Sequence, residues 1–144
     1  MSSYINGYGV NLNMVPKDDM DFLSLIKMDK DIYDDYKEYL KDIDVDTEDN
    51  DSAYGYVSDA EFNGYFGLCS LLCNIININE GLELCCDEQD TEFGMVFYPE
   101  VLPWKVNEKM RNITREELDD IFRKYINVLT KTPLIISEMV LWVE

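Results

Sequence analysis

The sequence predicts an α+β fold in a single domain, with a mostly antiparallel sheet and helices packed on one of its faces. At 144 residues the chain has the usual length of one domain, and no repeat or linker interrupts it. Predicted strands lie at both ends and in a central hairpin, and clusters of predicted helices separate them. The predicted order over residues 1–144 is therefore β-α-α-α-β-β-α-β.

The first predicted elements are one strand and two helices. Residues 4–12 are predicted to form a strand that its two glycines weaken or bulge. A helix is predicted over residues 16–28, because proline suits its first turn and three aspartates suit its positive end. One apolar stripe predicts a second helix over residues 31–43. Residues 44–57 show no helical stripe and are predicted to form an acidic loop.

Two capping boxes predict where the later helices begin. Residues 58–61 (SDAE) open a predicted helix that ends near residue 76 and forms the centre of the core. Residues 114–117 (TREE) open another, which ends near residue 129. In each box a hydroxyl and a carboxylate satisfy backbone N–H groups that the first turn of a helix leaves without partners.

The remaining segments are predicted strands and connections. Residues 81–87 and 92–98 alternate between apolar and polar side chains, which predicts a β-hairpin whose turn lies at residues 88–91. The segment 99–104 (PEVLPW) is predicted to be rigid and irregular, and a final strand is predicted over residues 135–143.

The distribution of charge is the feature that bears on function. The net charge of the chain is −18, and residues 42–104 hold fifteen Asp and Glu without a single Lys or Arg. A composition of 47% hydrophobic residues places this charge on a folded domain. Such a surface repels nucleic acid and anionic membranes and attracts basic proteins or cations.

Several classes of function are disfavoured by what the sequence lacks. The chain has no histidine, which excludes Ser-His-Asp and Cys-His catalysis and every zinc site that uses imidazole. It has no phosphate-binding glycine loop, and none of its many acid pairs stands out as catalytic. We therefore predict a protein that is not an enzyme and has no cofactor. With no signal peptide or long apolar segment, it is predicted to be cytoplasmic.

The four cysteines are predicted to be reduced thiols that pack as small apolar side chains. Cys69 and Cys73 lie one turn apart on a predicted helix. Cys85 and Cys86 are adjacent on a predicted strand, so they should point to opposite sides. A strand can aim only one of such a pair at a metal ion, and we therefore predict no metal site.

The densest acidic run admits more than one interpretation. Asp42, Asp44 and Asp46 match positions 1, 3 and 5 of an EF-hand loop, but Thr47 replaces its glycine and Ala53 its final glutamate. The run can be a calcium-binding site, a solvated loop in an acidic scaffolding domain, or a protein-binding surface. The absence of compensating lysines favours the binding surface, since like charges destabilise one another without a partner.

Two acidic segments and two tyrosines form the predicted binding surface. Carboxylates spaced along a loop and a hairpin can substitute for nucleic-acid phosphates, and tyrosines can anchor arginines. The tyrosines can equally well cover the edge of the core. The residues predicted to contact the partner are Asp42, Asp44, Asp46, Glu48, Asp49, Asp51, Tyr54, Tyr56, Glu83, Asp87, Glu88, Asp90 and Glu92.

In its general character, chiefly over residues 42–104, the chain resembles small acidic antidefence proteins of phages, including anti-CRISPR proteins and DNA mimics. It is also similar to bacterial immunity proteins that neutralise basic nuclease toxins. This resemblance implies a stoichiometric inhibitor that occupies the basic, nucleic-acid-binding surface of an effector. It implies no catalytic residue, and no direct contact with nucleic acid or membrane.

Overall fold

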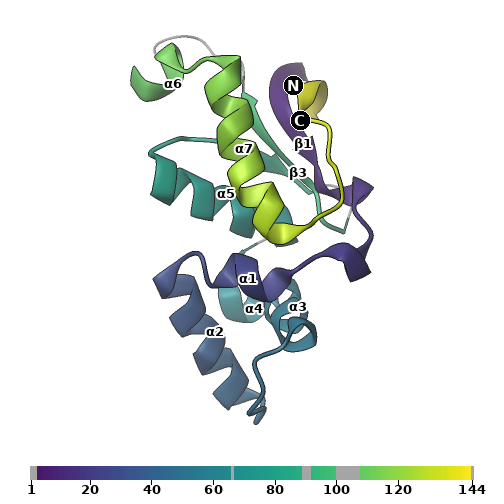
Figure 1. Ribbon diagram of the computed structural model, residues 1–144, viewed down its shortest axis with the longest axis vertical. Coiled ribbons are helices and arrows are strands. Elements are labelled where there is room, and N and C mark those ends of the chain that lie inside the picture. Colours follow the sequence, from purple (N-terminus) through teal and green to yellow (C-terminus); the bar gives the residue numbers. More distant parts are fainter. Residues whose placement is uncertain (1–2, 66, 89–91, 100–107, 144) are drawn as a thin grey trace.

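The computed structural model describes residues 3–65, 67–88, 92–99 and 108–143. It confirms the predicted α+β class: one four-stranded antiparallel sheet lies beside a larger helical part (Figure 1). The strand order is β2-β3-β1-β4. The bounds of the strands are β1 Ser3–Asn11, β2 Cys85–Asp87, β3 Met95–Pro99 and β4 Ser137–Val143.

The sheet joins the two ends of the chain to the predicted hairpin. β1 pairs with β3 on one side and with β4 on the other, so the first and last strands are neighbours and both ends of the chain lie together (Figure 1). β2 pairs with β3, which confirms the hairpin, but β2 covers only the last three residues of the predicted strand 81–87. Residues 89–91 of its predicted turn, and residues 100–104 of the predicted irregular segment, lie outside the described residues.

Two long helices cover one face of the sheet, as predicted. The register places Val10 opposite Val96, and both are fully buried beneath α5 (Gly67–Glu80) and α7 (Arg115–Leu129). On the same face, the hydroxyl of Tyr8 donates a hydrogen bond to Asp119 of α7. Burial of these apolar side chains is the main favourable contribution to folding.

The helices with the clearest apolar stripes form where they are predicted. α2 spans Lys30–Asp42, and Asp29 caps it by accepting a hydrogen bond from the backbone N–H of Ile32. α7 begins after Thr114, whose hydroxyl accepts from the N–H of Glu117 at 3.1 Å. Both caps satisfy N–H groups that have no partner within the helix.

The predicted helix over residues 16–28 is wrong in part. A short 3-10 helix, Lys17–Asp19, is followed by a β-bridge between Met20 and Thr130, and α1 then covers only Phe22–Ile26. The break occurs because the N–H of Asp21 donates to the carbonyl of Leu129 at 2.6 Å, which fixes extended backbone before α1. A second short 3-10 helix, Leu12–Met14, precedes this segment.

The predicted boundaries on either side of residue 58 are also wrong. Part of the predicted loop 44–57 is a helix, α3, over Asn50–Ser58. The predicted helix 58–76 is two helices, α4 (Ala60–Asn63) and α5. Gly64 separates them with φ of +77°, a conformation that glycine adopts without a steric penalty. A further short helix, α6 (Glu108–Asn112), was not predicted.

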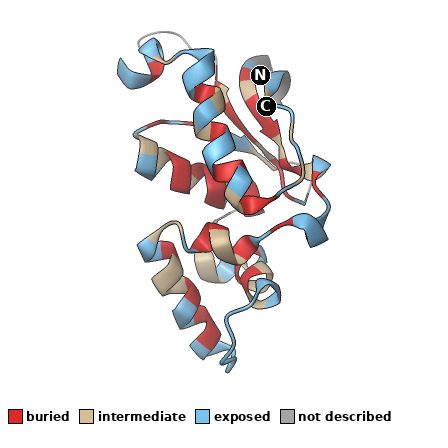
Figure 2. Ribbon diagram, in the orientation of Figure 1, coloured by how far each residue is buried: buried red, intermediate tan, exposed pale blue. Residues whose placement is uncertain are grey.

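The helices α1, α2, α3 and α4 lie below α5 and the C-terminal end of α7, at the opposite end of the molecule from α6 (Figure 1). We call residues 17–65 the helical half. It holds sixteen of the acids and five of the bases, so it carries −11 of the total charge of −18. Figure 2 shows that the connection between α2 and α3, at the far end of this half, is exposed along its length.

Candidate protein-interaction surface

We call residues 42–51 the connection between α2 and α3; it includes the last residue of α2 and the first two of α3. This acidic connection has a defined conformation at both ends. At the end of α2, the N–H of Val45 donates to the carbonyl of Leu40 at 2.9 Å, and that of Asp44 donates to Lys41 at 3.2 Å. These two bonds form a Schellman motif, whose αL position is usually glycine. Here the position holds Asp44, with φ of +58°.

The other end of the connection is a reciprocal cap. The carboxylate of Asp49 accepts from the backbone N–H of Ser52 at 2.8 Å, and the hydroxyl of Ser52 accepts from the N–H of Asp49 at 3.2 Å. A hydroxyl thus takes the role that Glu or Gln has in the usual capping box. Asp49 therefore has a structural function besides its charge.

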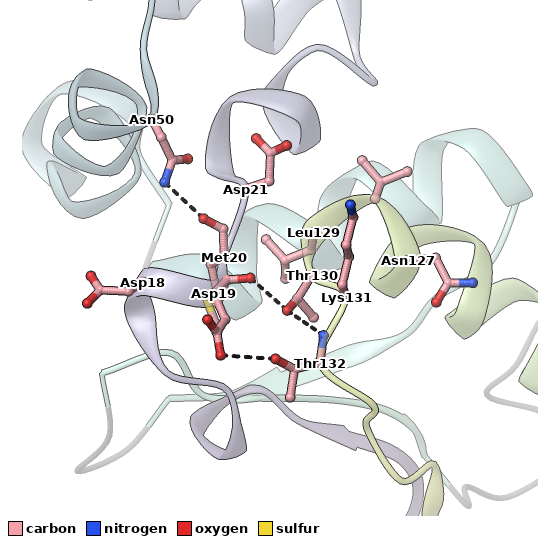
Figure 3. Close-up of a pocket in the computed structure, with 11 residues that line it drawn as sticks. Asp18, Asp19, Met20, Asp21, Asn50, Asn127, Leu129, Thr130, Lys131 and Thr132 are labelled. Carbon is pink, nitrogen blue, oxygen red and sulfur yellow. Dashed lines mark hydrogen bonds between the residues drawn. The ribbon is translucent and has the colours of Figure 1, made fainter.

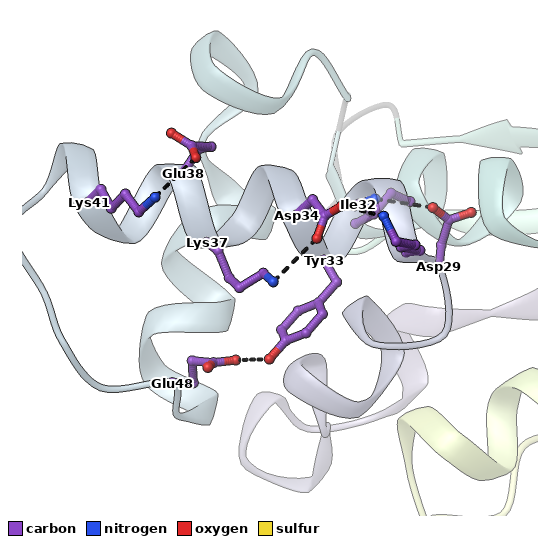
Figure 4. Close-up of polar contacts among 9 residues, drawn as sticks. Asp29, Ile32, Tyr33, Asp34, Lys37, Glu38, Lys41 and Glu48 are labelled. Atoms are coloured by element: carbon purple, nitrogen blue, oxygen red, sulfur yellow. Dashed lines mark hydrogen bonds and ion pairs between the residues drawn. The ribbon is translucent and has the colours of Figure 1, made fainter.

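A tyrosine on α2 contacts the connection directly before the cap of α3. The hydroxyl of Tyr33 donates a hydrogen bond to the carboxylate of Glu48 (Figure 4), and this bond raises the pKa of Tyr33. Lys37 lies 4.7 Å from the centroid of the same ring. Glu48 is therefore held toward α2.

The lysines of α2 are paired on α2 itself. Lys30 and Lys37 lie 3.0 and 3.3 Å from Asp34, and Lys41 lies 3.3 Å from Glu38 (Figure 4). Within the described part of the chain, no Lys or Arg forms an ion pair with an acid of the connection. The acids concerned, all exposed, are Asp42, Asp44, Asp46, Glu48, Asp49 and Asp51.

Asn50 joins this segment to a second group of acids that is distant in the sequence. Its side-chain oxygen accepts from the N–H of Phe22 at 2.7 Å, and its side-chain nitrogen donates to the carbonyl of Met20 at 2.9 Å (Figure 3). Asp21 lies between these two residues. The ends of two acidic segments are therefore adjacent, and Asp49 and Asp51 flank the residue that joins them.

A surface groove of about 780 Å³ lies at this junction (Figure 3). One wall carries Asp18, Asp19 and Asp21, and Asn127 and Lys131 line it from the end of α7 and the residues that follow. We define the acidic surface as the six acids of the connection together with these three aspartates of the groove. They come from two segments of the helical half, residues 18–21 and 42–51.

The predicted acids of the hairpin do not stay together. Glu92 accepts a hydrogen bond from the hydroxyl of Tyr54 at 2.6 Å, so it lies beside α3. Glu83 lies at the opposite end of β2, where its N–H contacts the sulfur of Met110 in α6. Asp87 and Glu88 are half-buried, and Asp90 lies outside the described residues. Among the described residues, the bond from Tyr54 to Glu92 is what places the hairpin beside α3.

The predicted role of Tyr56 is wrong. Its side chain is 0% exposed, and its hydroxyl donates to Asp35 at 2.8 Å, so Tyr56 is part of the core and cannot reach a partner. Tyr54 is half-buried and has Lys17 3.7 Å from the centre of its ring. A cation of the chain itself therefore occupies the ring face that was predicted to receive an arginine.

The described residues contain no group of three or more His, Cys, Asp or Glu side chains arranged to hold a metal ion. Over the same residues, no helix has the length and apolar character needed to cross a bilayer. The six acids of the connection are exposed, so their charge is presented to solvent.

Sequence reasoning missed Asp18, Asp19, Asp21, Tyr33 and Asn50 as parts of this region. The three aspartates were interpreted only as favourable charges at the start of a helix. An asparagine directly after Asp49 could have indicated a helix start, since short polar side chains favour such positions. Its bonds to a segment 28 and 30 residues away have no local signal.

The geometry defines an acidic α+β protein with one predominantly negative end. No model of a known protein family matches the chain, and neither does any curated protein or solved structure.

Proposed function

We propose that the protein is a stoichiometric inhibitor that binds the basic, nucleic-acid-binding surface of an effector protein through its acidic surface. The observation that carries this proposal is the exposed connection between α2 and α3, whose acids form no ion pair with a described base while the lysines of α2 are paired elsewhere. In an ordinary surface segment, mixed charges would stabilise one another.

The conformation of Asp44 supports the same function. A residue with a Cβ atom in the αL region is less stable than glycine there, by about 1 kcal/mol. The chain thus places an exposed carboxylate where glycine would favour folding. A contact made by that carboxylate with a cationic partner would account for its presence.

Apolar side chains interleaved with the acids add a second kind of contact. Ile43 is 44% exposed and Val45 is 36% exposed, and they alternate with Asp42, Asp44 and Asp46. Apolar side chains that become buried in an interface contribute affinity that charge alone does not. The alternation therefore suits a protein partner better than a diffuse layer of cations.

A nucleic-acid-binding partner is favoured because its surface is built to neutralise a row of negative charges. Carboxylates on the connection and on the groove would occupy the Arg and Lys side chains that otherwise contact phosphates, and binding would then depend steeply on salt. Occupation of this surface blocks the effector without any chemical step by the inhibitor. A nuclease toxin and a nucleic-acid-guided nuclease both offer such a surface.

The test begins with capture of partners from lysate of the native host on the immobilised protein, at about 50 and about 200 mM salt. The captured protein is then purified, and its binding to the inhibitor is measured with increasing amounts of its own DNA or RNA ligand. We expect binding that falls steeply between the two salt concentrations and competition between nucleic acid and inhibitor. Simultaneous binding of both ligands would contradict the proposal.

A further inference from the structure

Three thiols meet between α5 and β2, at a distance from the acidic surface. Cys69 and Cys73 lie one turn apart on α5, and Cys86 faces them from β2. The register pairs Cys86 with Val96, which is fully buried on the helix-covered face of the sheet, so the side chain of Cys86 lies on the side of β2 that faces α5. Cys85 pairs with Phe97 on the opposite face of the sheet, which confirms that the adjacent cysteines point to opposite sides.

The two thiols on α5 are fixed in place by the backbone around them. The sulfur of Cys73 lies 2.9 Å from the carbonyl oxygen of Leu84, to which it can donate, and 3.5 Å from the side-chain nitrogen of Asn77. The sulfur of Cys69 lies so close to Gly94 that a Cβ atom there would be 2.4 Å away. Both thiols are buried, whereas Cys86 is exposed, so the group has one accessible member.

The protonation of the three thiols differs according to their surroundings. The hydrogen bonds from Cys69 and Cys73 lower the pKa of Cys86. The same bonds, together with burial, raise the pKa of Cys69 and Cys73. These shifts favour the thiolate form at Cys86 and the thiol form at Cys69 and Cys73. A thiolate is the nucleophilic form of cysteine, and accessible thiolates beside a second thiol are typical of oxidation-sensitive sites.

We propose that Cys86 is a site of oxidation by peroxides, and that a thiol of α5, Cys69 or Cys73, then forms a disulfide with it. The geometry that carries this inference is the position of the exposed Cys86 on the α5-facing side of β2. The residues on either side of it lie close to the two buried thiols: the carbonyl of Leu84 contacts Cys73, and the carbonyl of Asp87 lies, like Cys69, beside Gly94. The result would be a covalent bond between the edge strand of the sheet and the central helix, independent of whether the acidic surface binds a partner.

The chemistry balances with hydrogen peroxide as the oxidant. The thiolate of Cys86 attacks one oxygen, the O–O bond breaks, and the hydroxide that leaves is protonated to water, which gives a sulfenic acid. A thiol of α5 then attacks the sulfur of Cys86, the S–O bond breaks, and the hydroxyl leaves as water with the proton of the thiol. In sum, two thiols and one peroxide give one disulfide and two waters.

The test uses the whole protein and hydrogen peroxide. After a short exposure to one equivalent, free thiols are alkylated, and the digested protein is examined by mass spectrometry. We expect a linked pair of peptides that joins Cys86 to Cys69 or Cys73. In the variant Cys69→Ser/Cys73→Ser, we expect a sulfenic acid on Cys86 that dimedone traps. A linkage or sulfenic acid found first on Cys85 would overturn the proposal.

The neighbouring cysteine supplies the matched control. Cys85→Ser removes an exposed thiol from the same strand and should leave the rate of internal disulfide formation within about twofold of the original. Cys86→Ser should lower that rate at least about tenfold. Circular dichroism establishes that both variants are folded, which is expected because both side chains are exposed. Equal effects of the two substitutions would contradict the proposal.

Discussion

The side-chain amide of Asn50 donates a hydrogen bond to the carbonyl oxygen of Met20 at 2.9 Å, and its side-chain oxygen accepts one from the N–H of Phe22 at the start of α1. Through this contact, two acidic segments that are far apart in the sequence are adjacent in the fold. Nine of the sixteen acids of the helical half therefore belong to the acidic surface. The stability of this half and the charge of the acidic surface can be tested separately, because Asn50 affects the first and the exposed acids determine the second.

Replacement of Asn50 tests the junction itself. Asn50→Ala removes two hydrogen bonds to partly buried backbone groups, so we expect it to lower the free energy of unfolding by about 2 kcal/mol. Urea denaturation followed by circular dichroism measures this change. Asn127→Ala, on the opposite wall of the groove, removes an exposed side chain and should change the free energy by less than about 0.5 kcal/mol. Equal effects would show that Asn50 does not join the segments.

Replacement of Asp44 separates stability from binding. Glycine has no steric penalty at the αL position, so Asp44→Gly should raise the free energy of unfolding by about 1 kcal/mol while it removes one acid of the proposed interface. The same denaturation experiment and a binding assay measure the two effects. Asp46→Gly is the control, because Asp46 has no positive φ and glycine there should give no gain. A loss of stability in Asp44→Gly would contradict the αL conformation of Asp44.

Glu80 should make stability depend on pH in the acidic range. The hydrogen bond from Tyr125, and the ion pair with Lys124 at 3.0 Å, lower the pKa of Glu80 below its ordinary value of 4.5. Its ionised form therefore stabilises the fold above about pH 4.5, and this contribution is lost as the pH falls through the lowered pKa.

We expect Glu80→Gln to lower the free energy of unfolding by about 1 kcal/mol at pH 7, with a difference that shrinks as the pH falls below 4.5. Thermal unfolding over a series of pH values measures it. Glu83→Gln changes an exposed neighbour and should have little effect at any pH. A difference between Glu80→Gln and the original protein that stayed constant down to pH 2 would rule out this role.

Two glycines with positive φ should tolerate alanine very differently. At Gly94, with φ of +81°, a Cβ atom would lie 2.4 Å from the sulfur of Cys69 and 2.8 Å from the carbonyl oxygen of Asp87. At Gly64, with φ of +77°, an added Cβ atom would have no atom within 4 Å apart from those of its chain neighbours and its own helix backbone. We expect Gly64→Ala to cost about 1 kcal/mol and Gly94→Ala at least about 3 kcal/mol, measured by urea denaturation. Equal costs would contradict the packing described around the thiols.

The sequence predicted the fold where local signals and packing agree. α2 and α7 each combine a side-chain cap with an apolar stripe, and both form as predicted. α3 was missed because its cap pairs Asp49 with a serine, and because Gly55 lies inside the helix. A Cβ atom at Gly55 would lie 3.0 Å from the hydroxyl oxygen of Tyr39, so close packing explains a glycine that local propensity disfavours.

The candidate surface was predictable in composition but not in arrangement. The acids of residues 42–51 are exposed as their charge suggests, because ionised side chains are costly to bury. The contribution of Asp18, Asp19 and Asp21 depends on long-range bonds of Asn50, and the burial of Tyr56 depends on the course of α3. The convergence of Cys86 with both thiols of α5 is likewise a tertiary contact without a local signal.

The most direct test of the account is affinity for the captured effector after two triple charge reversals. Asp42→Lys/Asp46→Lys/Asp51→Lys changes the acidic surface and spares Asp49, which caps α3. Glu108→Lys/Glu116→Lys/Asp120→Lys changes the net charge equally on α6 and α7. We predict that the first raises Kd at least about tenfold and the second less than about threefold at the same salt concentration. Equal losses of affinity, or none, would contradict binding through the acidic surface.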